Sequence, residues 1–122
     1  MARIVESPPL GKYVTISDKD DLPKPGDHAF AHGMDEEELI QVIISPDNIY
    51  GSAVHPEHTC AYIKNRDPQK MMTKEPDKQI SVAIVRDDSS YEAHVVTSYN
   101  TDYLTKTVNV NDVRYTNKNR LR

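Results

Sequence analysis

Histidine is the residue type in this chain best suited to chemistry near neutral pH, because its ring gains and loses a proton there. The chain holds five histidines, and four of them fall in two close pairs. His28 and His32 lie in "HAFAH", whereas His55 and His58 lie in "HPEHTC". Such spacing suits either general acid–base catalysis or the binding of a metal ion. His94 stands alone inside an apolar stretch, and we expect it to be an ordinary strand residue.

The metal alternative has suitable donors but no established spacing. His55, His58 and Cys60 belong to residue types that bind zinc, and a helical "HAFAH" would bring both rings to one side. The first segment lacks the Glu of a zinc-protease helix, and the second contains Pro56. We therefore predict no metal site and no cofactor, with a zinc-dependent module as an alternative.

Metal-independent cleavage of RNA needs a group that removes the proton of the 2′-hydroxyl and a group that protonates the leaving oxygen. It also needs cations or hydrogen-bond donors around the phosphate. The histidine pairs offer the first two groups, and the hydroxyl-rich "TSY" at the end of a predicted strand offers donors. The candidates for catalysis are His28, His32, His58, Thr97 and Tyr99, and those for substrate binding are Lys64 and Arg86. In the plain alternative, the first histidine pair flanks a helix start at the surface.

Length and composition limit the possible classes of protein. The chain has 122 residues, of which 37% are hydrophobic and 28% charged, as expected for one domain with a small core. Its net charge of −4 argues against a general nucleic-acid binder, although the basic end "RYTNKNRLR" leaves room for a local polyanion site. No apolar run suits a bilayer or a secretory signal, and the single cysteine cannot form an internal disulfide. We expect a cytoplasmic site of action without membrane contact.

Local patterns predict one helix followed by several strands. Asp35 and Glu38 form a capping box, and the apolar residues from Leu39 to Ile44 continue a helix that stops at "SPDN". Alternating patterns predict strands in "TCAYIK", "QISVAIVR", "YEAHVVTSY" and "KTVNVNDVRY". Residues 1–26 are predicted to be an N-terminal arm with one short edge strand, "KYVTISD". The predicted fold class over residues 27–122 is α+β, with an N-terminal helix packed on a four-stranded, mainly antiparallel sheet.

The order of "HAFAHGMDEEELIQVIISPDNI", "ISVAIV" and "EAHVVTSY" resembles the small RelE-like domains of the barnase, EndoU, colicin and RelE group of metal-independent ribonucleases. The resemblance spans about residues 27–103. It implies an endoribonuclease toxin module with RNA as its substrate, encoded by a phage or delivered from another cell. In this pattern His28 opens the first helix as the principal proton-transfer group, and Thr97 and Tyr99 orient the phosphate. His32 stands where many relatives have Arg, and an immunity protein or antitoxin is the implied partner.

A non-catalytic binding protein is the main alternative function. Phage inhibitors, immunity proteins and antitoxins are often acidic, because they cover or mimic basic partners. The sequence pI of about 5.7 suits this class. In that case the histidines would be incidental to function.

Overall fold

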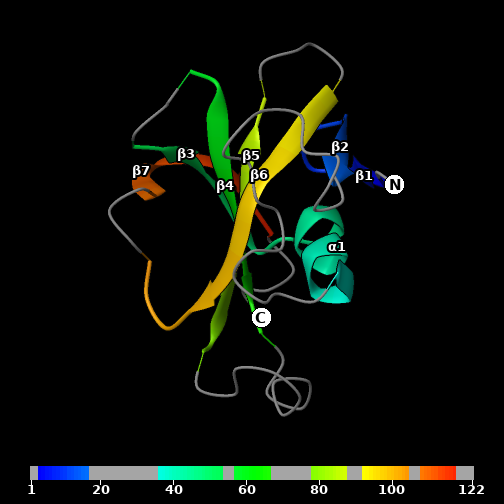
Figure 1. The fold of residues 1–122 in the computed structure, drawn as a ribbon. Coiled ribbons are helices and arrows are strands. Elements are labelled where there is room, and N and C mark those ends of the chain that lie inside the picture. The colour runs from blue at the N-terminus through cyan, green and yellow to red at the C-terminus, as the bar shows by residue number, and fades with distance from the viewer. Residues whose placement is uncertain are drawn as a thin grey trace.

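A computed structural model describes residues 3–16, 36–53, 57–66, 78–87, 92–104 and 108–117. Within these ranges the chain forms one helix and seven strands (Figure 1). In chain order the elements are β1 (Arg3–Ser7), β2 (Lys12–Ile16), α1 (Glu36–Ile44), β3 (Asn48–Ser52), β4 (Thr59–Asn65), β5 (Ile80–Arg86), β6 (Glu92–Thr101) and β7 (Val108–Thr116).

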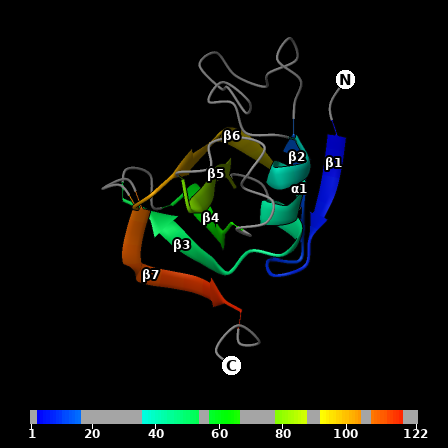
Figure 2. The same ribbon diagram turned by 90° about the horizontal axis from the view of Figure 1, so that it is seen from below.

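The seven strands form one mixed sheet in the order β1-β2-β6-β5-β4-β3-β7. Neighbouring strands are antiparallel except for β2 and β6, which are parallel. The sheet curls around α1, with β1 and β2 on one side of the helix and β3 on the other (Figure 2). This curl gives the sheet a face that contacts the helix, called the helix face below, and an opposite outer face.

The helix forms where the sequence predicts it, because apolar residues recur on one side of its nine residues. Leu39, Val42 and Ile43 are fully buried against the sheet, whereas Ile44 turns towards solvent. The amide of Ser45 still donates to the carbonyl of Gln41, at 2.9 Å. Pro46 follows directly, and a proline disfavours a further helical turn because it lacks an amide proton and restricts the residue before it.

The main core lies between α1 and the helix face. It contains residues from α1 and from six of the strands, among them Val5, Val14 and Ile49. Tyr62 is fully buried there, and its hydroxyl shares a 2.6 Å hydrogen bond with the hydroxyl of Ser7. This bond links the N-terminal hairpin to β4. Breaking it would leave a buried hydroxyl without a partner, which costs free energy.

A smaller core lies on the outer face. Ala61, Ile63, Val82 and Val108 are buried there, so that the start of β7 covers the middle of β4 and β5. Tyr99 is among the partly buried side chains that pack against this cluster. The central strands are therefore covered on both faces, which explains why their sequences are almost continuously apolar.

The predicted four-stranded, RelE-like or barnase-like architecture is wrong. The strands predicted at residues 59–64, 79–86, 91–99 and 106–115 all form, and the short edge strand predicted in the arm forms as β2, although it lies between β1 and β6 and not at an edge. Strands β1 and β3 join the same sheet as well. The hairpin β1–β2 arises within the predicted arm and buries Val5, Val14 and Ile16 against the helix. Strand β3 follows the helix almost at once and pairs with both β4 and β7. The result is a mostly β structure with one short helix.

Candidate functional site

One line of Cα partners crosses five strands on the outer face of the sheet. Ile4 of β1 lies opposite Thr15 of β2, and Thr15 lies opposite His94 of β6. His94 lies opposite Arg86 of β5, which in turn lies opposite Thr59 of β4. We call the four polar members, Thr15, His94, Arg86 and Thr59, the polar row. Paired Cβ atoms lie about 5 Å apart in such a sheet, so these side chains are direct neighbours.

Burial on the two faces shows where the polar row points. Val14 and Ile16 belong to the core under the helix, and so do Ala93 and Val95. Because side chains alternate between faces along a strand, the residues between these pairs point to the outer face. Those residues are Thr15 and His94, and both are half-buried.

A β-bulge in β6 adds Thr97 to the polar row. Val95 is the partner of Val85, but Thr97 is the partner of Ile84, so Val96 is an extra residue in β6. Residues three positions apart normally point to opposite faces of a sheet. The extra residue reverses that relation, and Thr97 therefore lies on the outer face with His94. Bulges often re-aim side chains next to functional sites.

Buried polar atoms lie at this place, and among them Nδ1 of His94 and Oγ1 of Thr97 have no hydrogen-bond partner among the described residues. Leaving such an atom without a partner costs about 1–3 kcal/mol. A bound ligand or water that supplies the missing hydrogen bonds would recover part of this free energy.

The charge of the polar row favours an anion. An arginine side chain carries a flat, positively charged guanidinium group that can bind two oxygen atoms of one phosphate, and Arg86 places such a group in the row. None of the five members, Thr97 included, is a carboxylate, but exposed Glu6 of β1 lies on the same face, opposite Tyr13 of β2. The neighbouring Asp87 forms an ion pair of 2.5 Å with Lys12, and Lys12 alternates with outward-pointing Tyr13 on β2. The Asp87 carboxylate therefore points away from the outer face and is already neutralised.

The predicted histidines differ in what the structure says of them. His28 and His32 lie outside the described residues. His58 directly precedes Thr59 and is exposed, with its Nε2 atom 3.9 Å from a carboxylate oxygen of Glu57. Its carbonyl accepts a hydrogen bond from the amide of Asp87, so it lies at the same end of β4 and β5 as the row.

Tyr99 and Lys64 lie further from the polar row. Tyr99 shares the outer face, two residues beyond Thr97, and packs against the smaller core. Lys64 alternates with outward-pointing Ile63 on β4, and its Nζ atom donates to the carbonyl of Ser45 at 2.8 Å. The structure thus brings together Arg86 and Thr97 from the predicted set, and it places Lys64 by the end of the helix.

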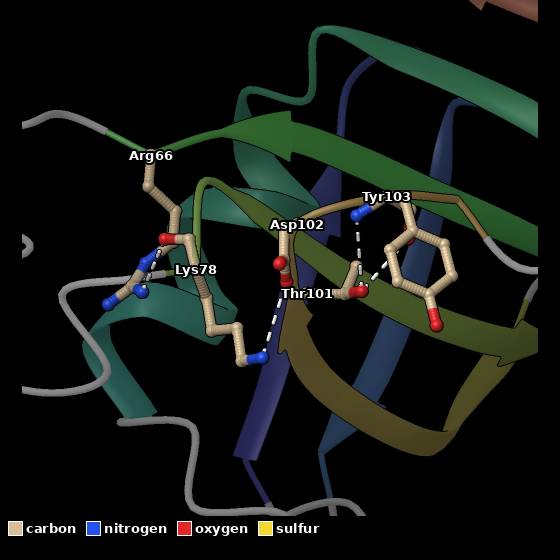
Figure 3. Close-up of polar contacts among 5 residues, drawn as sticks. All are labelled: Arg66, Lys78, Thr101, Asp102 and Tyr103. Carbon is tan, nitrogen blue, oxygen red and sulfur yellow. Dashed lines mark hydrogen bonds and ion pairs between the residues drawn. The ribbon is translucent and has the colours of Figure 1, made fainter.

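Polar side chains at the opposite end of the sheet bond to one another and to nearby backbone carbonyls (Figure 3). Arg66 donates to the carbonyl of Lys78 at 2.9 Å, and Lys78 pairs with Asp102 at 3.2 Å. Thr101 donates its hydroxyl proton to the carbonyl of Tyr103 at 2.9 Å. These contacts hold the strand ends together, and they are a structural arrangement rather than a second site.

Cys60, one of the possible zinc donors, lies in the main core. It is 1% exposed, and burial raises the pKa of its thiol to about 12. A thiol with this pKa is neutral at physiological pH, whereas zinc binds the thiolate. In the described part of the chain no three His, Cys, Asp or Glu side chains group together as metal ligands would.

Sequence reasoning missed His94 and Thr15 as members of the site. The alternating pattern of β6 explains His94 as a strand residue, but only the pairing of β6 with β5 and β2 puts it between Arg86 and Thr15. One local signal did exist. The doublet Val95-Val96 breaks the alternation of β6, and such a break indicates a bulge.

Comparison with protein families, with characterised proteins and with solved structures gives no match. The resemblance to ribonuclease domains therefore remains a prediction about function. The helix that the structure describes is too short to cross a membrane.

Proposed function

We propose that this protein is a metal-independent endoribonuclease that binds the scissile phosphate of RNA at the polar row. One observation carries the proposal. Arg86, His94 and Thr97 share one face of the sheet, and the two buried atoms His94 Nδ1 and Thr97 Oγ1 have no hydrogen-bond partner among the described residues. An imidazole can transfer a proton in phosphate-ester cleavage, and a cation and a hydroxyl can stabilise the charge that grows on the phosphate.

The reaction would be an attack of the 2′-oxygen of RNA on the adjacent phosphorus. A bond forms between the 2′-oxygen and phosphorus, the bond to the 5′-oxygen breaks, and a 2′,3′-cyclic phosphate results. One group takes the proton of the 2′-hydroxyl, and another gives a proton to the leaving 5′-oxygen. Negative charge grows on the phosphate oxygens meanwhile, and the Arg86 guanidinium and the Thr97 hydroxyl would stabilise it.

His94 is one proton-transfer group in this proposal, because it is the direct cross-strand partner of Arg86 on the same face of the sheet. The second comes from the predicted histidines His28, His32 and His58. His58 lies at the same end of β4 and β5 as the polar row. Tyr99, further along the same face, would contact the neighbouring part of the substrate.

The test is cleavage of tRNA and mRNA by the purified protein in the presence of a metal chelator. Arg86→Ala should lower kcat/KM by about 100-fold or more, and His94→Ala by a similar or greater factor. Arg86→Lys should retain part of the activity, because it keeps the charge but loses the two-pronged contact. Lys78→Ala is the matched control, since it removes a cation at the opposite end of the sheet.

Activity that disappears with chelator would contradict the proposal, and so would equal activity of Arg86→Ala and Lys78→Ala. Intact RNA with every variant, including the unaltered protein, would favour the non-catalytic binding protein instead. An immunity protein or antitoxin stays a predicted partner, and a cytoplasmic site of action a predicted location. Poor cell growth on expression, relieved by Arg86→Ala, would support the toxin assignment.

A further inference from the structure

The two edges of the sheet differ in how well they suit the addition of another strand. Among the described residues, β1 and β7 each have a neighbouring strand on one side only. β7 shifts its register against β3 twice, and such irregularities hinder strand addition. β1 pairs with β2 in an unbroken register over all five of its residues, and it is the outermost strand on its side of the sheet (Figure 2). The regular edge of β1 is therefore the better template for a further strand.

Apolar surface is exposed beside this edge. Ile4 of β1 is 65% exposed on the outer face, and Tyr13, its diagonal neighbour on β2, is 55% exposed. Diagonal neighbours lie about 7–8 Å apart, within reach of an aromatic side chain. Val5, between Ile4 and the next outward residue, belongs to the main core. One face of β1 is thus buried, and a strand added at its edge would cover part of the other.

The charge on the outer face of the hairpin is negative. Four of its side chains point to that face, and Glu6 is the one charged residue among them: Ile4, Glu6, Tyr13 and Thr15. Glu6 is exposed, and it lies opposite Tyr13. The Cα partner of Tyr13 on β6 is a second glutamate, Glu92. A cation opposite Glu6 on an added strand would stabilise the pairing, whereas a carboxylate there would weaken it.

A second copy of this chain fits the edge poorly. Two β1 strands that pair antiparallel over their full length would place Ile4 of each opposite Glu6 of the other. The two glutamates would then be diagonal neighbours with like charges. A shift by two residues in either direction pairs only three residues of each strand, and one of these shifts puts the glutamates directly opposite each other. The edge therefore favours a partner with a different sequence.

We infer that the free edge of β1 binds an extended segment of a partner protein as an additional antiparallel strand. This segment carries a lysine or arginine opposite Glu6 and an apolar residue opposite Ile4. Main-chain hydrogen bonds supply the affinity, and the two side-chain pairs supply the specificity. The inference does not depend on the proposed ribonuclease function, because Arg86 of the polar row lies on β5, three strands away from β1.

The test uses a fluorescein-labelled peptide with the central sequence Thr-Lys-Val-Ile-Thr. Antiparallel to β1, this peptide has its lysine opposite Glu6 and its isoleucine opposite Ile4. A second peptide has glutamate in place of the lysine. By fluorescence anisotropy, the unaltered protein should bind the lysine peptide about fivefold more tightly than the glutamate peptide, and Glu6→Lys should reverse this preference.

Glu57→Lys is the matched control. It changes the net charge by the same amount, but its side chain is 86% exposed and lies beside β4, on the far side of the sheet's centre. The preference for the lysine peptide should therefore persist in this variant. The melting temperature of each variant checks that the fold is intact. No binding of the lysine peptide, or an equal change of preference in Glu6→Lys and Glu57→Lys, would overturn the inference.

Two N-methylated forms of the lysine peptide test the binding mode. In an added strand, every second backbone N–H points to the neighbouring strand and the others point away from it. Methyl groups on one set of alternate amides should weaken binding by about tenfold or more, and those on the other set by less than about twofold. Equal weakening by both sets would contradict strand addition. A dimeric mass of the unaltered protein that Glu6→Lys changes to a monomeric mass would show that a second copy occupies the edge instead.

Discussion

The ion pair between Arg66 and Glu38 should stabilise the fold far more than its surface counterparts do. Arg66 Nε lies 2.8 Å from Glu38 Oε1, and the Arg66 side chain is only 2% exposed. A second donor, Arg66 Nη1, binds the carbonyl of Lys78. Arg66 therefore joins α1, the end of β4 and the start of β5.

The expected loss for Arg66→Met follows from what it leaves behind. The Glu38 carboxyl group would lose this donor, and its other oxygen is already buried without a hydrogen-bond partner among the described residues. Breaking a fully buried pair from one side costs about 3–5 kcal/mol. Glu38 is 25% exposed, and the water that reaches it limits the cost to the lower end of that range. We expect the free energy of unfolding to fall by about 3 kcal/mol, and the melting temperature by about 12 °C.

The assay is urea unfolding followed by circular dichroism, with Lys78→Met as the control. The Lys78–Asp102 pair has side chains that are 34% and 53% exposed, so its loss should cost less than about 1 kcal/mol. The double variant Arg66→Met with Glu38→Leu should recover most of the lost stability, because it leaves no unpaired buried charge. A loss for Arg66→Met no larger than that for the control would refute this reasoning.

Two further predictions concern the buried thiol of Cys60 and the close contact at Gly51. The pKa of Cys60 is raised from about 9 to about 12, so its stabilisation is complete below pH 9 and is lost as the pH rises from 9 to 12. Urea unfolding measured below pH 9 and again at pH 10 checks this. The free energy of unfolding of the unaltered protein should fall by about 1.4 kcal/mol more than that of Cys60→Ala. Burial also raises the pKa of Tyr62, which adds a similar loss only above pH 10. Gly51→Ala should destabilise the protein by only about 1 kcal/mol, because its Cβ would overlap the Asp112 carboxylate, which lies at the end of a 39% exposed side chain and can turn aside. Adding Asp112→Ala should restore the melting temperature, and a melting temperature of the double variant as low as that of Gly51→Ala alone would contradict this explanation.

The elements of this fold were largely predictable from local sequence. The helix at residues 36–44 and five of the strands follow from apolar periodicity, which depends only on neighbouring residues. The fold class was not predictable in this way. Strand β1 is too short to show a period, and β3 begins only four residues after the helix ends, within a segment that looks like a helix stop.

The sequence alone also identified Arg86 and Thr97 as residues with suitable chemistry. It did so from their types and their positions at the ends of predicted strands. It could not show that His94 belongs with them, because a histidine in an apolar strand has no local feature that separates a core residue from a functional one.

Two features of the tertiary structure decide the candidate site. The parallel pairing of β2 with β6 joins segments about 79 residues apart and brings Thr15 to His94. The bulge at Val96 turns Thr97 to the same face. Amino-acid type and period are properties of a short segment, but register and neighbouring strands depend on which surfaces the whole chain can bury together. For this reason the chain's own sequence specifies its chemical groups, and only the assembled sheet determines which of them meet.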